Sequence, residues 1–255
     1  MQLKKIAVLS ALVSSLTLAS VSAALADNPT PTPNATVTAR GAERLPDIQA
    51  RVDKRISRRI DVLNKLVSRL GSDTHLAAND KSLLLNEDQN AISSLNSLKA
   101  KIDADTTIAD ARTDEAQLPT IHVYDFIVPQ NHRLIAVDNL QALAAKVGTS
   151  LTNIQAKVTN LQNHGTDVSA IQALLTDANS KLLTINGQLT IDERELSALT
   201  PTSSNPAATF TQVRQDFGTI RTGFSGIKTD LTQMKADAQS LKKPTPTSPA
   251  PTATP

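Results

Sequence analysis

The chain has 255 residues, no cysteine and a formal net charge of +2. The lack of cysteine excludes disulfides, a thiol nucleophile and a lipid-modified cysteine. The nearly balanced charge argues against general electrostatic affinity for nucleic acid. Only 2% of the residues are aromatic, so a core would consist mainly of Leu, Ile, Val and Ala.

Residues 1–26 have the pattern of a secretory signal peptide. Lys4 and Lys5 precede an apolar stretch over residues 6–25, which ends in the small-residue cleavage pattern Ala24-Leu25-Ala26. The alternative is a retained membrane anchor, but serines and threonines dilute the stretch and prolines follow it directly. We therefore expect cleavage after Ala26, no transmembrane helix afterwards, and a secreted or extracytoplasmic location in the cell envelope.

Two segments rich in proline and threonine flank the predicted folded region. Residues 27–45 and 244–255 are short of apolar residues, so they lack the means to bury a core. We expect a linker and a disordered tail.

Residues 46–105 predict a helical hairpin. The first helix, over 46–71, combines an apolar stripe with a basic face, and acidic residues surround the second, over 80–103. Opposite charges on neighbouring helices favour an antiparallel pair that also matches electrostatically. The basic residues are Arg51, Lys54, Arg55, Arg58, Arg59, Lys65 and Arg69, and the acidic ones are Glu87, Asp88, Asp103, Asp105, Asp110, Asp114 and Glu115.

Residues 106–130 predict an irregular connector. Within it, the residues of 119–129 alternate between two sides as in a short strand, but the sequence predicts no second strand to pair with it. Three interpretations stay open: a connector lying in a groove between helical units, a recognition segment, or a continuation of the following helix kinked at Pro129. If the segment is a recognition site, its candidate lining is Tyr124, Phe126 and Arg133.

Residues 131–243 predict three long antiparallel helices, over 131–163, 167–199 and 207–243. Each keeps an apolar spacing of three and four residues over more than four heptads. Asp192 interrupts the stripe, either because it fixes the helix alignment or because the core frays there. Gly218, Gly223 and Gly226 either permit close helix approach or mark a kink. The predicted fold is an elongated, all-α antiparallel bundle with coiled-coil-like helices.

The run TIHVYDFIVPQNHRLIAVDNL follows LKAKIDADTTIADARTD and the basic VDKRISRRIDVLNKLVSRL. This combination resembles a family of uncharacterised secreted helical proteins of candidate-phylum bacteria. The likeness spans roughly residues 39–243 through loosely defined motifs. It implies export from a bacterial cell and transfers no functional site.

No motif in the sequence indicates catalysis, a metal site or a cofactor. The four histidines lie in none of the spacings used by helical metal sites, and Gly-x-Ser-x-Gly is missing. We therefore predict a non-enzymatic structural, scaffolding or interaction protein of the cell envelope that acts through helical surfaces. The alternative is an extracytoplasmic binding module or chaperone-like protein for an envelope polyanion or a client chain.

The predicted partners follow from these two functions. Apolar seams would contact a protein partner or a second copy of the chain, whereas the basic helix would contact an envelope polyanion through Arg55, Arg58 and Arg59. We expect no nucleic acid specificity, because the basic helix lacks interleaved aromatic residues.

Overall fold

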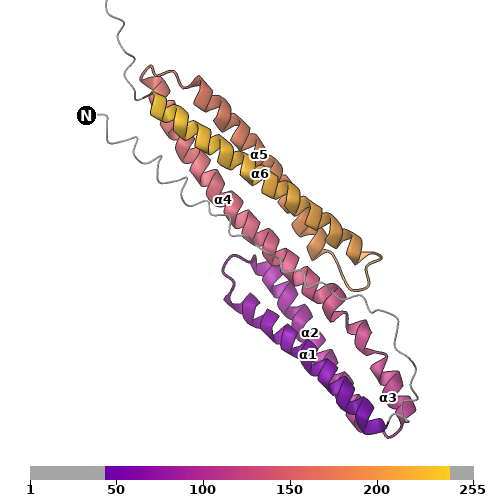
Figure 1. The fold of residues 1–255 in the computed structure, drawn as a ribbon. Helices are drawn as coiled ribbons and strands as arrows, with labels where there is room; N and C mark the ends of the chain where they lie inside the picture. The colour runs from indigo at the N-terminus through magenta and orange to yellow at the C-terminus, as the bar shows by residue number, and fades with distance from the viewer. Residues whose placement is uncertain (1–43, 242–255) are drawn as a thin grey trace, which may run out of the picture. The chain divides into compact units, whose positions relative to one another are not determined.

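The computed structural model describes residues 44–241, and every regular element within that range is helical (Figure 1). The all-α prediction is confirmed. The predicted signal peptide, its cleavage after Ala26 and the tail over 244–255 lie outside the described residues. The predicted linker does too, apart from its last two residues.

The helices form two compact units. The first unit contains residues 44–140 and 190–215, and the second contains residues 141–189 and 216–241. This division differs from the predicted boundary after residue 130, because three long helices each contribute to both units. The elements are α1 (Leu45–Ser72), α2 (Ala78–Ala104), α3 (Ile108–Glu115), η3 (Leu118–Ile121), η4 (Val123–Ile127), α4 (Val128–Asn163), α5 (Ser169–Ser197) and α6 (Pro206–Ser240).

In the first unit, α1 and α2 form the predicted antiparallel hairpin (Figure 1). Gln49 near the start of α1 donates a 2.9 Å hydrogen bond to the carbonyl of Ile102 near the end of α2. Apolar residues at three-four spacing meet between the helices, and Ile48, Ile56 and Leu95 have no exposed surface. Burial of this stripe is the main stabilising contribution to the hairpin.

The segment predicted to be irregular is instead largely helical. Thr107 caps α3 by accepting a hydrogen bond from the backbone N–H of Asp110. The 3₁₀-helix η3 ends at His122, whose φ of 53° is the one positive value outside glycine in residues 44–241. The π-helix η4 then leads directly into α4. Pro129 is the second residue of α4, directly after this change from π-helix to α-helix.

The burial pattern explains why the strand-like alternation was misleading. Val123, Phe126 and Ile127 are buried, whereas Tyr124 is 49% exposed. A strand would bury every second residue, but spacings of three and four mark one helical face. The third interpretation, a continuation of the following helix, is nearest to the observed structure.

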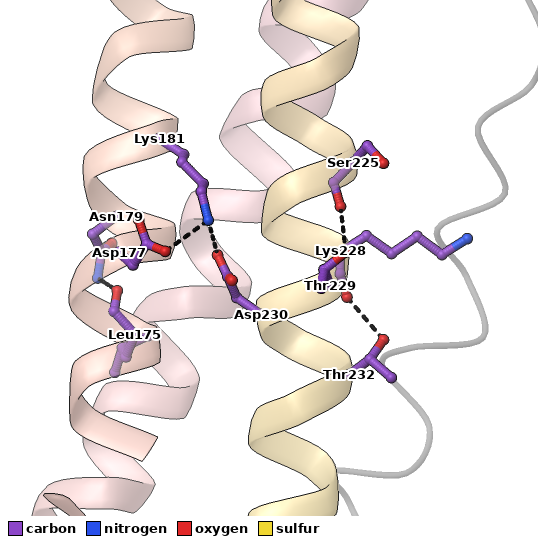
Figure 2. A network of polar contacts seen from close by, with 9 residues as sticks. All are labelled: Leu175, Asp177, Asn179, Lys181, Ser225, Lys228, Thr229, Asp230 and Thr232. Atoms are coloured by element: carbon purple, nitrogen blue, oxygen red, sulfur yellow. Dashed lines mark hydrogen bonds and ion pairs between the residues drawn. The ribbon is translucent and has the colours of Figure 1, made fainter. Parts of the chain in front are cut away.

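In the second unit, α5 runs antiparallel to α4, and α6 runs antiparallel to α5. Gly148 faces Leu182 while Gln155 bonds Gln172, so α5 returns along α4. Figure 2 shows the pairing of α5 with α6, where Lys181 lies 2.7 Å from Asp230.

The glycines of α6 have two different environments. A Cβ on Gly223 would lie 3.0 Å from Ile185, and one on Gly226 would lie 3.1 Å from Lys181. Gly218 has no such neighbour within 4 Å. The helix is continuous over Pro206–Ser240, so Gly223 and Gly226 permit close helix approach rather than a break.

Candidate functional site

The basic face of α1 meets α3 through a shared carboxylate. Glu115 accepts from Arg51 at 2.6 Å and also pairs with Arg55. The Glu115 side chain is only 17% exposed, whereas the arginines keep 44% and 38% of theirs. This partly buried carboxylate therefore fixes two guanidinium groups at the protein surface.

A third arginine is held by an aromatic ring. The guanidinium carbon of Arg59 lies 5.1 Å from the centre of the Tyr124 ring, and Arg59 also donates to the Arg55 carbonyl at 3.3 Å. Burial lowers the pKa of Arg59, and the neighbouring charge of Arg55 acts in the same direction. A guanidinium stays charged at neutral pH in spite of this shift. Tyr124 thus serves as a half-exposed platform for a cation.

Arg58 completes this surface. It lies three residues after Arg55 and one before Arg59, so it neighbours Arg55 on the helix. It is exposed and has no acidic partner among the described residues. We call Arg55, Arg58, Arg59 and Tyr124 the Arg–Tyr surface. The structure thus brings four of the six sequence-predicted binding residues together.

The other two predicted residues, Phe126 and Arg133, belong to the core and its edge. Phe126 is 2% exposed and its ring centre lies 5.9 Å from that of Phe210. Arg133 covers the other ring of this pair at 4.6 Å and donates to the carbonyls of Phe210 and Pro129. Phe126 is therefore a core residue and does not line an open groove, whereas a binding role for the half-buried Arg133 stays a prediction. Their apolar and backbone contacts occupy them within the chain.

The predicted charge match between the first two helices is also different in the structure. Lys99 of α2 pairs with Asp53 of α1 at 2.6 Å, which is the reverse of the expected polarity. The main carboxylate for the α1 arginines is Glu115 of α3. Lys54 and Lys65 are exposed on α1 and have no carboxylate partner in the described part of the chain. Part of the basic face is thus neutralised internally and part is not.

A groove of about 700 Å³ lies in the first unit, and none of its lining residues belongs to the Arg–Tyr surface. Its walls combine neutral hydroxyl and amide groups with the apolar side chains of Ala91, Leu98, Ile121, Ile127 and Pro201. Its one cation, Lys101, pairs with Asp114 at 3.1 Å, so the groove has little attraction for an anion. The polar lining consists of Glu87, Asn90, Ser93, Ser94, Ser97, Lys101, Gln117 and Thr120.

No protein-family model, curated protein or solved structure matches this chain. Within residues 44–241 no helix combines the length and apolarity needed to cross a membrane. The same residues contain no cluster of three or more His, Asp or Glu side chains able to hold a metal ion.

Sequence reasoning missed a row of polar side chains buried in the first unit. Asp80 and Asp88 of α2 face α4 and α5. Asp88 accepts from Asn131 at 3.1 Å, and Asp80 accepts from Ser197 at 3.0 Å. We call this set the buried polar row, and each member is at most 5% exposed: Asp80, Asp88, Gln130, Asn131 and Asp138.

Two further contacts complete the row. Asp138 of α4 accepts from the backbone N–H of Ala77 at 3.1 Å, just before α2 begins. Gln130 donates to the Leu196 carbonyl at 2.9 Å and so satisfies an acceptor in the last turn of α5. In each of four members, one side-chain oxygen accepts no hydrogen bond from described residues: Asp80 Oδ2, Asp88 Oδ2, Gln130 Oε1 and Asn131 Oδ1.

Burial dominates the ionisation of these carboxyl groups. It raises the pKa of Asp88 to about 7 and that of Asp138 to about 6, and it also raises the pKa of Asp80. The charged form is disfavoured because burial removes water from the carboxylate and no cation of the described residues takes its place. Asp192 of α5 is fully buried as well, which excludes the frayed-edge interpretation of this residue.

Proposed function

We propose that this chain is an exported, non-enzymatic interaction protein of the cell envelope that acts through a helical surface. The proposed binding region is the Arg–Tyr surface, and the proposed partner is a negatively charged envelope polymer. The observation that carries the proposal is the exposure of Arg58 beside two arginines that are already held in place by Glu115 and Tyr124.

This arrangement suits recognition of an anionic chain. Guanidinium groups bind phosphate and carboxylate oxygens with two parallel hydrogen bonds. Side chains held before binding lose less conformational entropy when a ligand arrives. Arg58 supplies an uncommitted cation, while Arg55 and Arg59 supply positioned ones.

The scaffolding alternative depends on the apolar seams of the long helices. Seam residues such as Leu151, Leu175 and Phe224 are at most 1% exposed within the single chain. A contact with a second copy would therefore need to use another surface or require the helices to separate. For this reason we favour the interaction role over self-assembly through the seams.

The test measures binding of fluorescently labelled inorganic polyphosphate by anisotropy. The variant Lys54→Glu/Arg58→Glu reverses two exposed cations that have no carboxylate partner among the described residues. The matched control, Arg221→Glu/Lys228→Glu, makes the same charge change on exposed positions of α6. We expect the first variant to weaken binding at least tenfold and the control to weaken it less than threefold.

Two results would count against the proposal: no saturable binding of polyphosphate at low salt, or equal losses in both variants. Equal losses would mean that the probe responds only to net charge. Binding through the surface should also fall as salt rises from 50 to 200 mM. A parallel titration with phosphatidylglycerol vesicles tests a membrane surface, and stronger binding there than to polyphosphate would replace the polymer with a lipid headgroup.

A further inference from the structure

The contact of α2 with α4 and α5 is formed by carboxyl groups rather than by apolar side chains alone. Asp80 and Asp88 occupy positions on the same stripe as Leu84 and Ala91 of α2, and all four are at most 5% exposed. A stripe that otherwise buries hydrocarbon therefore brings two acids into the core of the first unit.

Within residues 44–241, no cation pairs with the acids Asp80, Asp88 and Asp138. The hydrogen-bond donors to them are an amide, a hydroxyl and a backbone N–H, from Asn131, Ser197 and Ala77. Lys81, next to Asp80 in the sequence, donates to the carbonyls of Gly71 and Asp73 instead. Uncompensated carboxylates in such a site are costly, whereas neutral carboxylic acids are tolerated.

The charged groups that face this row add to the cost. Within α2, Glu87 lies next to Asp88 and disfavours its ionisation. From α5, Glu193 acts on both Asp80 and Asp138, and from the end of α1, Asp73 also acts on Asp138. Because these neighbours are all acidic, a rise in pH places several like charges in one contact.

We propose that this contact is an acid-held clamp: neutral Asp80, Asp88 and Asp138 keep α2 against α4 and α5, and their ionisation loosens it. The clamp is separate from the Arg–Tyr surface, and its test uses no ligand. An exported protein is exposed directly to the pH of its surroundings. The clamp would respond to that pH by a tighter or looser contact of α2 with α4 and α5.

The direction of the effect follows from the pKa shifts. A raised pKa means that the folded form holds its protons more tightly than the unfolded chain does. The stabilising contribution is therefore complete below the ordinary pKa of an aspartate and is lost as the pH rises through about 6 to 7. The clamp holds in mild acid and loosens in mild base.

The experiment is hydrogen–deuterium exchange of the whole chain at pH 5.5 and pH 8.5, with rates corrected for the chemical pH dependence of exchange. Peptides over residues 78–92 report the clamp. Peptides over residues 222–236 of the second unit serve as the internal control, since the buried Asp230 there is paired with Lys181. We expect protection in 78–92 to fall at least about tenfold between the two pH values, the change produced by one unit of pKa shift, and protection in 222–236 to change little.

The variant Asp88→Asn/Asp138→Asn keeps both side-chain acceptors but does not ionise. Its protection over 78–92 should fall much less between the two pH values than that of the wild type, because Asp80 is then the one clamp acid that can still ionise. The clamp is refuted if the wild-type protein shows no selective loss over 78–92, or if the variant loses protection as the wild type does.

A second measurement covers the case in which the variant fails to fold. Carbon-13 NMR titration of the aspartate carboxyl groups in the folded wild-type chain should show at least two midpoints near pH 6 to 7. Midpoints that all lie near 4 would overturn the proposal whatever the behaviour of the variant.

Discussion

Lys181 of α5 lies 2.7 Å from the carboxylate of Asp230 on α6, and Asp230 is only 6% exposed (Figure 2). The same ammonium also bonds Asp177 one turn earlier on α5, at 2.7 Å. Asp177 keeps 55% of its side chain exposed, so the two carboxylates depend on Lys181 to different degrees.

Replacing Lys181 by Met should destabilise the second unit by about 1 to 3 kcal/mol, because Asp230 would remain buried without its cation. Asp177→Asn, which removes only the exposed carboxylate, should cost less than about 0.5 kcal/mol. Urea unfolding followed by circular dichroism measures both values. Similar costs for the two variants would show that burial of Asp230 has no energetic weight.

Gly218→Ala and Gly223→Ala should have opposite effects. Alanine at position 218 meets no neighbour and gains up to about 1 kcal/mol of helix propensity. Alanine at position 223 would press on Ile185, so α5 and α6 should separate slightly and stability should fall by about 1 kcal/mol. Thermal unfolding midpoints compare the two, and a gain at both positions would contradict the close approach.

Phe126→Ala and Tyr124→Ala compare the loss of a core aromatic ring with the loss of a surface one. Loss of the buried Phe126 ring, packed against Phe210, should cost about 3 to 5 kcal/mol. Loss of the half-exposed Tyr124 ring should cost about 1 kcal/mol or less while weakening polyphosphate binding, since Arg59 would lose its platform. Urea unfolding measures the stability of both variants, and fluorescence anisotropy measures their affinity for polyphosphate. Unchanged affinity in Tyr124→Ala would remove this ring from the proposed surface.

Asp138→Asn should change the pH dependence of stability. Burial raises the Asp138 pKa to about 6, so the wild type loses this contribution as the pH rises through that value. The asparagine variant can still accept from the Ala77 N–H, and at pH 8 it should be more stable than the wild type by about 1 to 2 kcal/mol. At pH 4 the two should agree closely. A constant difference across this pH range would mean that folding does not shift the pKa of Asp138.

Gln130→Leu should destabilise the first unit by about 1 to 2 kcal/mol, because the Leu196 carbonyl would lose its donor inside the protein. Gln233→Leu makes the same replacement on an exposed turn of α6, where the amide only bonds Asp237, and should lie within about 0.5 kcal/mol of wild type. Urea unfolding of both variants is the comparison. Equal stability would mean that the hydrogen bond from Gln130 is replaced without cost.

The sequence predicted the long helices well because their apolar spacing is continuous. The helix over 46–71 became Leu45–Ser72, and the one over 131–163 became Val128–Asn163. Pattern reasoning failed where a buried position holds a polar residue. Gln130 and Asn131 continue the spacing set by Val123 and Ile127. Because these two side chains are polar, the apolar pattern did not indicate that α4 and η4 share one buried face.

The candidate sites were predicted less completely for the same reason. Exposed charge on α1 was visible as a run of arginines, so Arg55, Arg58 and Arg59 were identified. Asp88 appeared to belong to an acidic surface, although it completes the apolar stripe of α2 at four residues from Leu84 and three from Ala91. A break in such a stripe that is filled by a single aspartate is the signal that could have revealed the buried polar row.

The glycine contacts of α6 also restrict how the long helices can slide past one another. An apolar spacing of three and four residues repeats every heptad, so on hydrophobicity alone α6 could shift by seven residues along α5. Such a shift would place Asp216 or Asp230 where Gly223 now meets Ile185, at a site where even a Cβ would have to displace Ile185. Gly223 and the Lys181–Asp230 pair therefore select one alignment from several that the apolar residues would accept.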